Sequence, residues 1–215
     1  MAAITISRQY GSGGRKVALR LSEILGWTLF DKKLLMQVAS EVGLSAEEVV
    51  DFTEYDYKVK TIWDRLFSGG VVRDPTGSYT QHIITHEQMD QESSVRFVNR
   101  AILAAYEQGN VIIVGRGGQV LLGDKYDVLH VRVQASMDIR KTRLQAYEDI
   151  HTDDTEAIAL ERDKAASHYM KRFFNVDWDD PALYHLVINS QKLDTDTIAE
   201  LIANAAQQIL PVVQS

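Results

Sequence analysis

A glycine-rich segment between a strand-like run and a helix-like run restricts the architecture of this chain more than any other part of its sequence. Residues 3–7 are a short β-branched run, and Val17, Leu21 and Leu25 recur at helical spacing before Gly26. The segment between them contains Gly11, Ser12, Gly13 and Gly14. Backbone N–H groups of such a loop can converge on an anion, and the start of the next helix adds partial positive charge. A phosphate-binding loop is therefore predicted at the end of the first strand.

The remainder of the chain repeats the alternation of strands and helices. Further strands are predicted at 27–30, 111–114, 128–133 and 186–188. Helices are predicted at 14–25, 33–42, from 95 to an end at Gly109, at 136–147, at 155–172 and from 195 onward. Apolar strands separated by helices predict an α/β fold with a parallel five-stranded sheet flanked by helices. Residues 45–90 break the pattern and are interpreted as an insertion within a single domain, 1–215. Ligands of such sheets bind at the carboxyl ends of the strands.

Composition limits the partners that this chain can have. A net charge of −7 argues against broad binding to nucleic acid polymers, which needs a basic surface. No apolar run approaches the roughly 20 residues of a membrane-spanning helix, and the first residues do not resemble a secretory signal. The absence of cysteine excludes thiolate chemistry and fits a reducing compartment. We expect a cytoplasmic protein with small-molecule ligands; the sequence does not indicate its oligomeric state.

The glycine-rich loop departs from the phosphate-loop pattern G-x-x-x-x-G-K-[ST]. If Gly14 takes the second glycine, Gln9 falls on the first, Arg15 on the lysine and Lys16 on the Ser/Thr position. This register predicts that Arg15, with Lys16, contacts the β- and γ-phosphates of a nucleotide. Ser12 is then the nearest hydroxyl that could bind Mg²⁺. The alternative interpretation is a tight turn with both cations in solvent.

Several segments together resemble the cytidylate kinase-like family of P-loop kinases. The resemblance rests on residues 4–8, 11–15, 26–32, 111–117, 161–164, 169, 177–181, 184 and 186–190. It covers nearly the whole chain and is weakest from about 51 to 87. It implies a nucleoside monophosphate kinase fold with an insertion that binds the acceptor and a helical lid at about 145–180. It also implies ATP and Mg²⁺ as cofactors.

The same resemblance suggests roles for basic residues. Arg116 resembles the arginine of the family's third-strand turn, which contacts the acceptor monophosphate, although Val114 and Gly117 stand where that turn has aspartates. Arg162 and Lys171 lie in the lid segment and could stabilise the transferring group. The simpler interpretations are a structural ion pair for Arg116 and solvent-exposed helix faces for the lid cations.

Other candidates carry weaker signals. Arg8 could line the phosphate site or close the turn, and Asp31 could bind the acceptor or cap the following helix. Arg140 and Arg143 share one helix face near the start of the lid segment. His82 and His86 have ligand spacing but no identifiable third ligand, and the aromatic residues Tyr55, Tyr57 and Trp63 more often signify packing than base stacking.

These observations predict an ATP-dependent phosphotransferase that moves the γ-phosphoryl group to a nucleoside monophosphate, CMP or dCMP in the family's pattern. An acceptor that is already an ionised phosphate needs no general base. Two alternatives remain open: a nucleotide-binding regulatory module with weak turnover, and a kinase for a non-nucleotide metabolite.

Overall fold

The computed structural model describes residues 2–31, 33–35, 91–147 and 155–209. Within these ranges five strands form one parallel sheet in the order β2-β3-β1-β4-β5. The strands are β1 (Ala3–Arg8), β2 (Thr28–Phe30), β3 (Val111–Val114), β4 (Val128–Gln134) and β5 (Leu186–Asn189). Because β1 lies between β3 and β4, its carboxyl end sits where the strand order reverses, which is the usual ligand position in such sheets.

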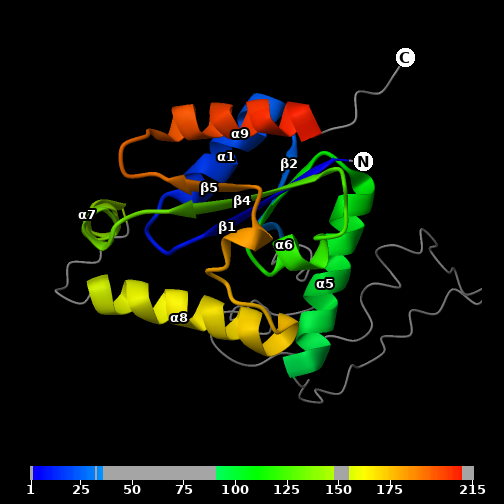
Figure 1. Cartoon of the computed structure of the whole chain (residues 1–215), viewed down its shortest axis with the longest axis horizontal. Coiled ribbons are helices and arrows are strands. Elements are labelled where there is room, and N and C mark those ends of the chain that lie inside the picture. Colours follow the sequence, from blue (N-terminus) through cyan, green and yellow to red (C-terminus); the bar gives the residue numbers. More distant parts are fainter. Residues whose placement is uncertain (1, 32, 36–90, 148–154, 210–215) are drawn as a thin grey trace, which may run out of the picture.

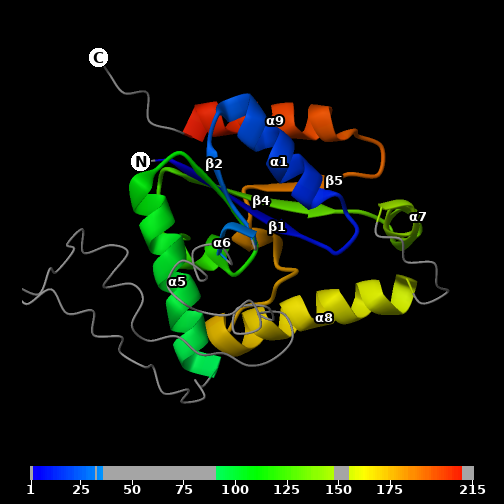
Figure 2. The same ribbon diagram turned by 180° about the vertical axis from the view of Figure 1, so that it is seen from behind.

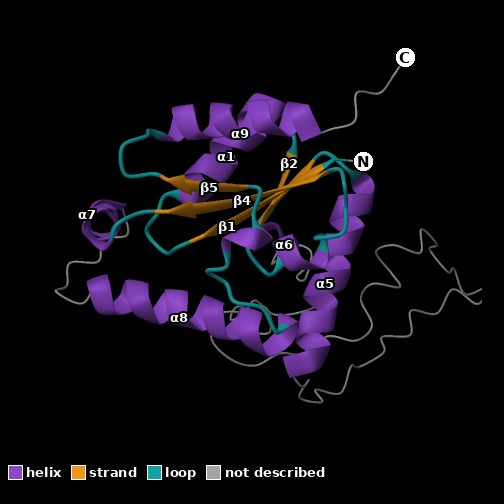
Figure 3. Cartoon of the chain, in the orientation of Figure 1, coloured by secondary structure: helices purple, strands orange, loops and turns teal. Residues whose placement is uncertain are grey.

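Helices cover both faces of this sheet (Figure 3). Figures 1 and 2 show α1 and α9 on one face and α5, α6 and α8 on the other, with α7 beyond the end of β4. The described elements are α1 (Gly14–Leu25), α5 (Gln91–Gln108), α6 (Gly118–Leu121), α7 (Met137–Tyr147), α8 (Thr155–Phe174), a 3₁₀ turn (Pro181–Leu183) and α9 (Thr195–Ile209).

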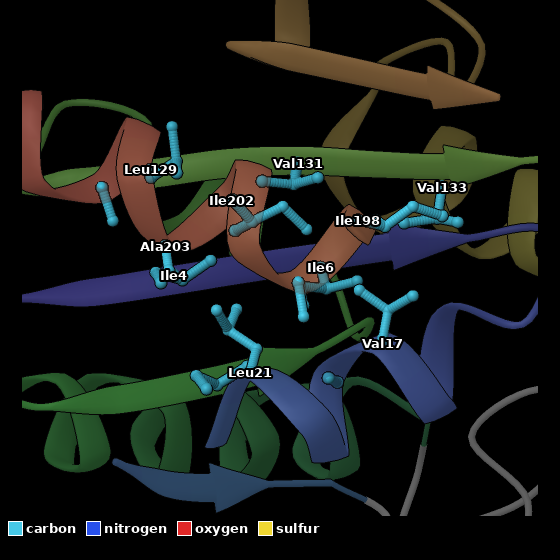
Figure 4. Close-up of a cluster of buried hydrophobic side chains, with 14 of the residues drawn as sticks. Ile4, Ile6, Val17, Leu21, Leu129, Val131, Val133, Ile198, Ile202 and Ala203 are labelled. Carbon is cyan, nitrogen blue, oxygen red and sulfur yellow. The ribbon is translucent and has the colours of Figure 1, made fainter. Parts of the chain in front are cut away.

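The face beneath α1 and α9 is apolar (Figure 4). Ile4 and Ile6 of β1 point to this side, since successive strand residues alternate between faces. They pack with Val17 and Leu21 of α1 and with Ile202 of α9. This apolar packing of α1 and α9 against the sheet fixes the position of α1 and therefore of the glycine-rich loop that precedes it.

The opposite face of the β1–β4 pair carries buried polar side chains. The strand register places Ser7 beside Arg132. Arg132 donates to the Trp178 carbonyl oxygen over 2.7 Å, lies 4.1 Å above the Trp178 ring, and forms an ion pair with Asp179. The indole nitrogen of Trp178 donates to Ser7 Oγ over 2.9 Å, and Tyr184 Oη lies 3.2 Å from Arg132 Nη1. This network fixes the segment after α8 against the end of β1.

The predicted five-stranded parallel sheet is confirmed, although β2 begins at Thr28 rather than at residue 27. The helix predicted from residue 95 to Gly109 runs from Gln91 to Gln108, and the short elements α6 and Pro181–Leu183 were not anticipated. The predicted insertion, most of the helix at 33–42, the two histidines and the aromatic run lie outside the described residues. No helix in the described ranges is long and apolar enough to cross a membrane.

Candidate active site

A cavity of about 830 Å³ lies at the carboxyl ends of the central strands. It is bounded by the glycine-rich loop, the turn after β3, one side of α8 and the loop between β5 and α9. Its lining contains six cationic side chains: Arg8, Arg15, Lys16, Arg116, Arg143 and Arg162. Among the described residues, only two carboxylates, Asp163 and Asp194, line it as well. In a chain of net charge −7, this is a local concentration of positive charge suited to an anionic ligand.

The glycine-rich loop has the backbone geometry of an anion cradle. Gly11 and Gly13 have φ of 79° and 83°, values that glycine adopts without strain. Gly13 caps α1, whose first residue is Gly14, and no side chain accepts a hydrogen bond at this cap. The first N–H groups of α1 therefore face the cavity with the positive end of the helix dipole behind them.

Two arginines of α7 hold the loop by its carbonyl oxygens. Arg140 Nε donates to the Tyr10 carbonyl over 2.6 Å, and Arg143 Nη1 donates to the Ser12 carbonyl over 2.8 Å. Asp163 of α8 accepts from the Tyr10 N–H at 2.8 Å and from Arg140 at 2.6 Å. The shared helix face of Arg140 and Arg143 thus serves, in this conformation, to shape the loop.

Ser12 is fully buried, and its Oγ has no hydrogen-bond partner among the described residues. The carbonyl oxygen of Ser12 also accepts from Ser190 Oγ over 2.7 Å. A hydroxyl enclosed in this way does not reach the open part of the cavity. The sequence placed Ser190 only in the segment 186–190 that resembles the family and did not assign it to the site, because residue spacing does not connect it with the loop.

Asp31 follows β2 and caps the next helical turn. Its Oδ1 accepts from the N–H groups of Lys33 and Leu34 at 2.8 and 3.1 Å. Its Oδ2 lies 3.2 Å from Arg15 Nη2, and the Arg15 side chain is 61% exposed. Of the two roles considered for Asp31, the helix cap is present in this geometry, and the same carboxylate holds Arg15 at the rim of the cavity.

Arg8 ends β1. It is an exposed residue, and its side chain lines the cavity. Burial lowers the pKa of the Arg8 guanidinium, the charge of Asp31 partly raises it, and Arg15 lowers it further. Arg8 therefore stands between the start of α1 and the turn after β3, where its guanidinium contacts Gly115.

The turn after β3 has a rare backbone. Gly115, Arg116 and Gly117 have φ of 75°, 59° and 75°, three left-handed residues in succession. The Gly118 N–H closes the turn by donating to the Gly115 carbonyl over 3.2 Å. A left-handed arginine is held under strain, a feature that recurs at functional sites. The turn places Arg116 among the residues that line the cavity.

Helix α8 supplies the remaining wall. Arg162 and Tyr169 line the cavity, whereas Lys171 is exposed and does not. The structure therefore brings Arg162 to the site and leaves Lys171 outside it. Tyr169 Oη is buried without a hydrogen-bond partner in the part of the chain described, and burial raises the pKa of Tyr169 to about 12 against an opposing effect of Arg116.

The described residues do not form a magnesium site of their own. They contain no group of three or more His, Cys, Asp or Glu side chains placed to hold a metal. The two lining carboxylates are occupied, Asp163 by Arg140 and Asp194 by the Thr197 N–H at 2.8 Å. Together with the enclosed hydroxyl of Ser12, this arrangement does not fit a protein-bound Mg²⁺.

Known proteins resemble the chain in both sequence and fold. Cytidylate kinase of Methanocaldococcus jannaschii is 28% identical over 134 residues, which are 61% of this chain and 72% of that protein. Cytidylate kinase of Thermococcus sibiricus is 24% identical over 97% of this chain and 89% of its own length.

Among solved structures, an uncharacterized protein of Eubacterium ventriosum has a TM-score of 0.65 at 20% identity, covering 96% of this chain and 99% of its own. Shikimate kinase of Bacteroides thetaiotaomicron has a TM-score of 0.52 at 12% identity, covering 96% and 98% of the two chains. These likenesses show that the chain shares its overall fold with both proteins. The model of the cytidylate kinase-like family matches residues 3–192, so the chain belongs to this kinase family.

Proposed function

We propose that this kinase transfers the γ-phosphoryl group of ATP to a nucleoside monophosphate, with CMP and dCMP as the first acceptors to test. The observation that carries the proposal is the cationic cavity, in which the N–H groups of the glycine-rich loop and six basic side chains meet at the reversal of strand order. Phosphoryl transfer depends chiefly on positioning and on positive charge around the transferring oxygens. The cytidylate kinase names of the relatives support a nucleotide as the acceptor.

Each side of the cavity has a proposed task. The loop amides at Gly11–Gly14 would bind the donor phosphates, with Arg15 and Lys16 adding charge at the rim. Arg116 would hold the acceptor phosphate from the opposite side, and Arg162 would approach the transferring group from α8. Mg²⁺ would bind chiefly to the nucleotide's own phosphates and water, where it would neutralise their charge.

The test is a transfer assay with ATP, Mg²⁺ and a panel of CMP, dCMP, UMP, AMP and shikimate, with ADP and the phosphorylated product both measured. We expect a nucleoside diphosphate product from at least one monophosphate. Phosphorylation of shikimate alone would contradict a nucleotide acceptor. ATP binding without transfer to any member of the panel would favour the regulatory-module alternative.

A variant of Arg116 separates acceptor binding from donor binding. Arg116→Gln removes a charged hydrogen-bond donor from the acceptor side, and such bonds contribute about 1.5–3 kcal/mol. We expect the acceptor KM to rise about 10- to 100-fold while the affinity for ATP stays within about threefold. Equal losses for donor and acceptor would contradict the assignment of Arg116 to the acceptor side.

A further inference from the structure

The path of the Arg8 side chain depends on a glycine at position 14. A Cβ added to Gly14 would lie 2.6 Å from Arg8 Cβ and 3.2 Å from Arg8 Cγ. The atoms in collision are the root of the Arg8 side chain and cannot swing aside as the end of a flexible chain can. Positions 8 and 14 therefore compete for one space between β1 and α1, and only one of them can carry a side chain.

The backbone does not explain why position 14 is glycine. Gly13 has φ of 83° and needs to be glycine for that reason, whereas Gly14 is the first residue of α1 and is not among the positive-φ residues. The second glycine of the pattern G-x-x-x-x-G-K is then better matched by Gly13. In this register Arg8 falls on the first glycine and Gly14 on the lysine. Compared with the pattern, the first glycine and the lysine have thus exchanged residue types: position 8 carries the basic residue and position 14 the glycine.

The Arg8 guanidinium lies where a phosphate-binding cation would be needed. It passes the start of α1 and reaches Gly115, next to Arg116 on the acceptor side. In the described part of the chain it makes no hydrogen bond or ion pair, and Asp31 and Arg15 act on it only through their charges. Because Arg8 is an exposed residue that lines the cavity, an anion can bind its guanidinium without breaking an existing ion pair. Arg15, by contrast, is held by Asp31 at 3.2 Å.

We propose that Arg8, from the strand before the loop, supplies the positive charge that phosphate loops ordinarily take from the lysine after it, and binds the β- and γ-phosphates of the donor. A guanidinium offers paired donors to phosphate oxygens and remains protonated. The proposal rests on the proposed function for the identity of the donor. It goes beyond the proposed function because it assigns the principal phosphate-binding cation to Arg8 instead of Arg15 and explains why position 14 is glycine.

The first experiment measures affinities for ATP, ADP, AMP and inorganic tripolyphosphate, together with kcat. Arg8→Met keeps most of the stem and removes the charge, while Arg8→Lys keeps the charge. Arg20→Ala is the matched control, because Arg20 is exposed on α1 and pairs with Glu23 and Asp196 away from the cavity. We expect Arg8→Met to weaken ATP and tripolyphosphate binding about 10- to 100-fold and AMP binding less than about threefold. Arg8→Lys should retain most of the affinity.

The second experiment tests the exchange itself. Arg8→Gly removes the clashing atoms, and Gly14→Lys restores a lysine after Gly13. Either change alone should lower ATP affinity, the first by removing the charge and the second by collision with Arg8. The double variant should bind ATP at least about tenfold better than Arg8→Gly, since one cation again fits the space, with a shift of a few tenths of an ångström at Val133, whose Cβ would lie 3.3 Å away.

The outcomes distinguish this proposal from the proposed function. Tripolyphosphate binding that depends on Arg8, without transfer to any acceptor, supports the role of Arg8 and removes the kinase proposal. Transfer by Arg8→Met at the rate of Arg20→Ala overturns the role of Arg8 and leaves the kinase proposal in place. If the double variant binds ATP no more tightly than Arg8→Gly, the proposed exchange between positions 8 and 14 is also overturned. A wild-type protein that binds neither ATP nor tripolyphosphate overturns both proposals.

Discussion

At the scale of a single residue, Gly117 combines two constraints that a side chain would violate. Its φ is 75°, and an added Cβ would lie 2.6 Å from Phe174 Cζ, at the end of α8. Gly117→Ala should therefore lower the free energy of unfolding by about 2–4 kcal/mol, from left-handed strain and overpacking together. Gly26→Ala is the control, because Gly26 has φ of 66° but nothing within 4 Å. It should lose only about 1–2 kcal/mol. Equal losses in chemical denaturation would rule out the contact with Phe174.

His130 should contribute to a pH dependence of stability. Burial lowers the pKa of His130 to about 4, with a further contribution from His185, whose ring is stacked 4.9 Å away. The unfolded chain, with a pKa near 6.5, binds the proton more readily than the folded chain between these values. Stability should thus fall by about 3 kcal/mol as the pH drops from about 7 to 4. When the free energy of unfolding is measured by denaturation at several pH values, it should vary less with pH in His130→Gln than in wild type. If it varies equally in both proteins, His130 is not the source of the pH dependence.

At the scale of elements, the tie between α7, α8 and the loop depends on Asp163. Arg140 is 4% exposed and its guanidinium pairs with Asp163 at 2.6 Å, so removing the carboxylate leaves a buried charge uncompensated. Asp163→Ala should lower the free energy of unfolding by about 3–5 kcal/mol and weaken ATP binding through the Tyr10 contact. The exposed pair of Lys141 and Glu156 joins the same two helices at 3.0 Å. Glu156→Gln should change stability by less than about 1 kcal/mol. Similar melting curves for Asp163→Ala and Glu156→Gln would show that the buried ion pair of Arg140 and Asp163 contributes little to stability.

At the scale of the whole molecule, the sheet is stabilised by helices on both faces, and α9 contributes through one side only. Ile202 is 0% exposed in the apolar cluster with Ile4 and Leu21, whereas its neighbour Leu201 is 47% exposed. Ile202→Ala should lower the free energy of unfolding by about 2–5 kcal/mol, and Leu201→Ala by less than about 0.5 kcal/mol. Because α9 packs on the face away from α8, neither change should alter ATP affinity in the folded protein. Unequal ATP affinities would indicate that α9 positions the β5–α9 loop.

The local pattern of the sequence determined the alternation of strands and helices, the glycine-rich loop and its place after β1. These are properties of neighbouring residues: strand period, helix period and the backbone freedom of glycine. Membership of the kinase family was also predictable, because its motifs are short contiguous segments.

Only the tertiary structure decided what each basic residue touches. Arg140 and Arg143 were predicted to share a helix face, but their contacts with loop carbonyl oxygens arise where α7 meets the glycine-rich loop. The competition between Arg8 and Gly14 was equally invisible along the chain. The physical reason is that a side chain's partner depends on how strands and helices from distant segments pack. Residue spacing records periodicity within one element and carries no distance between elements.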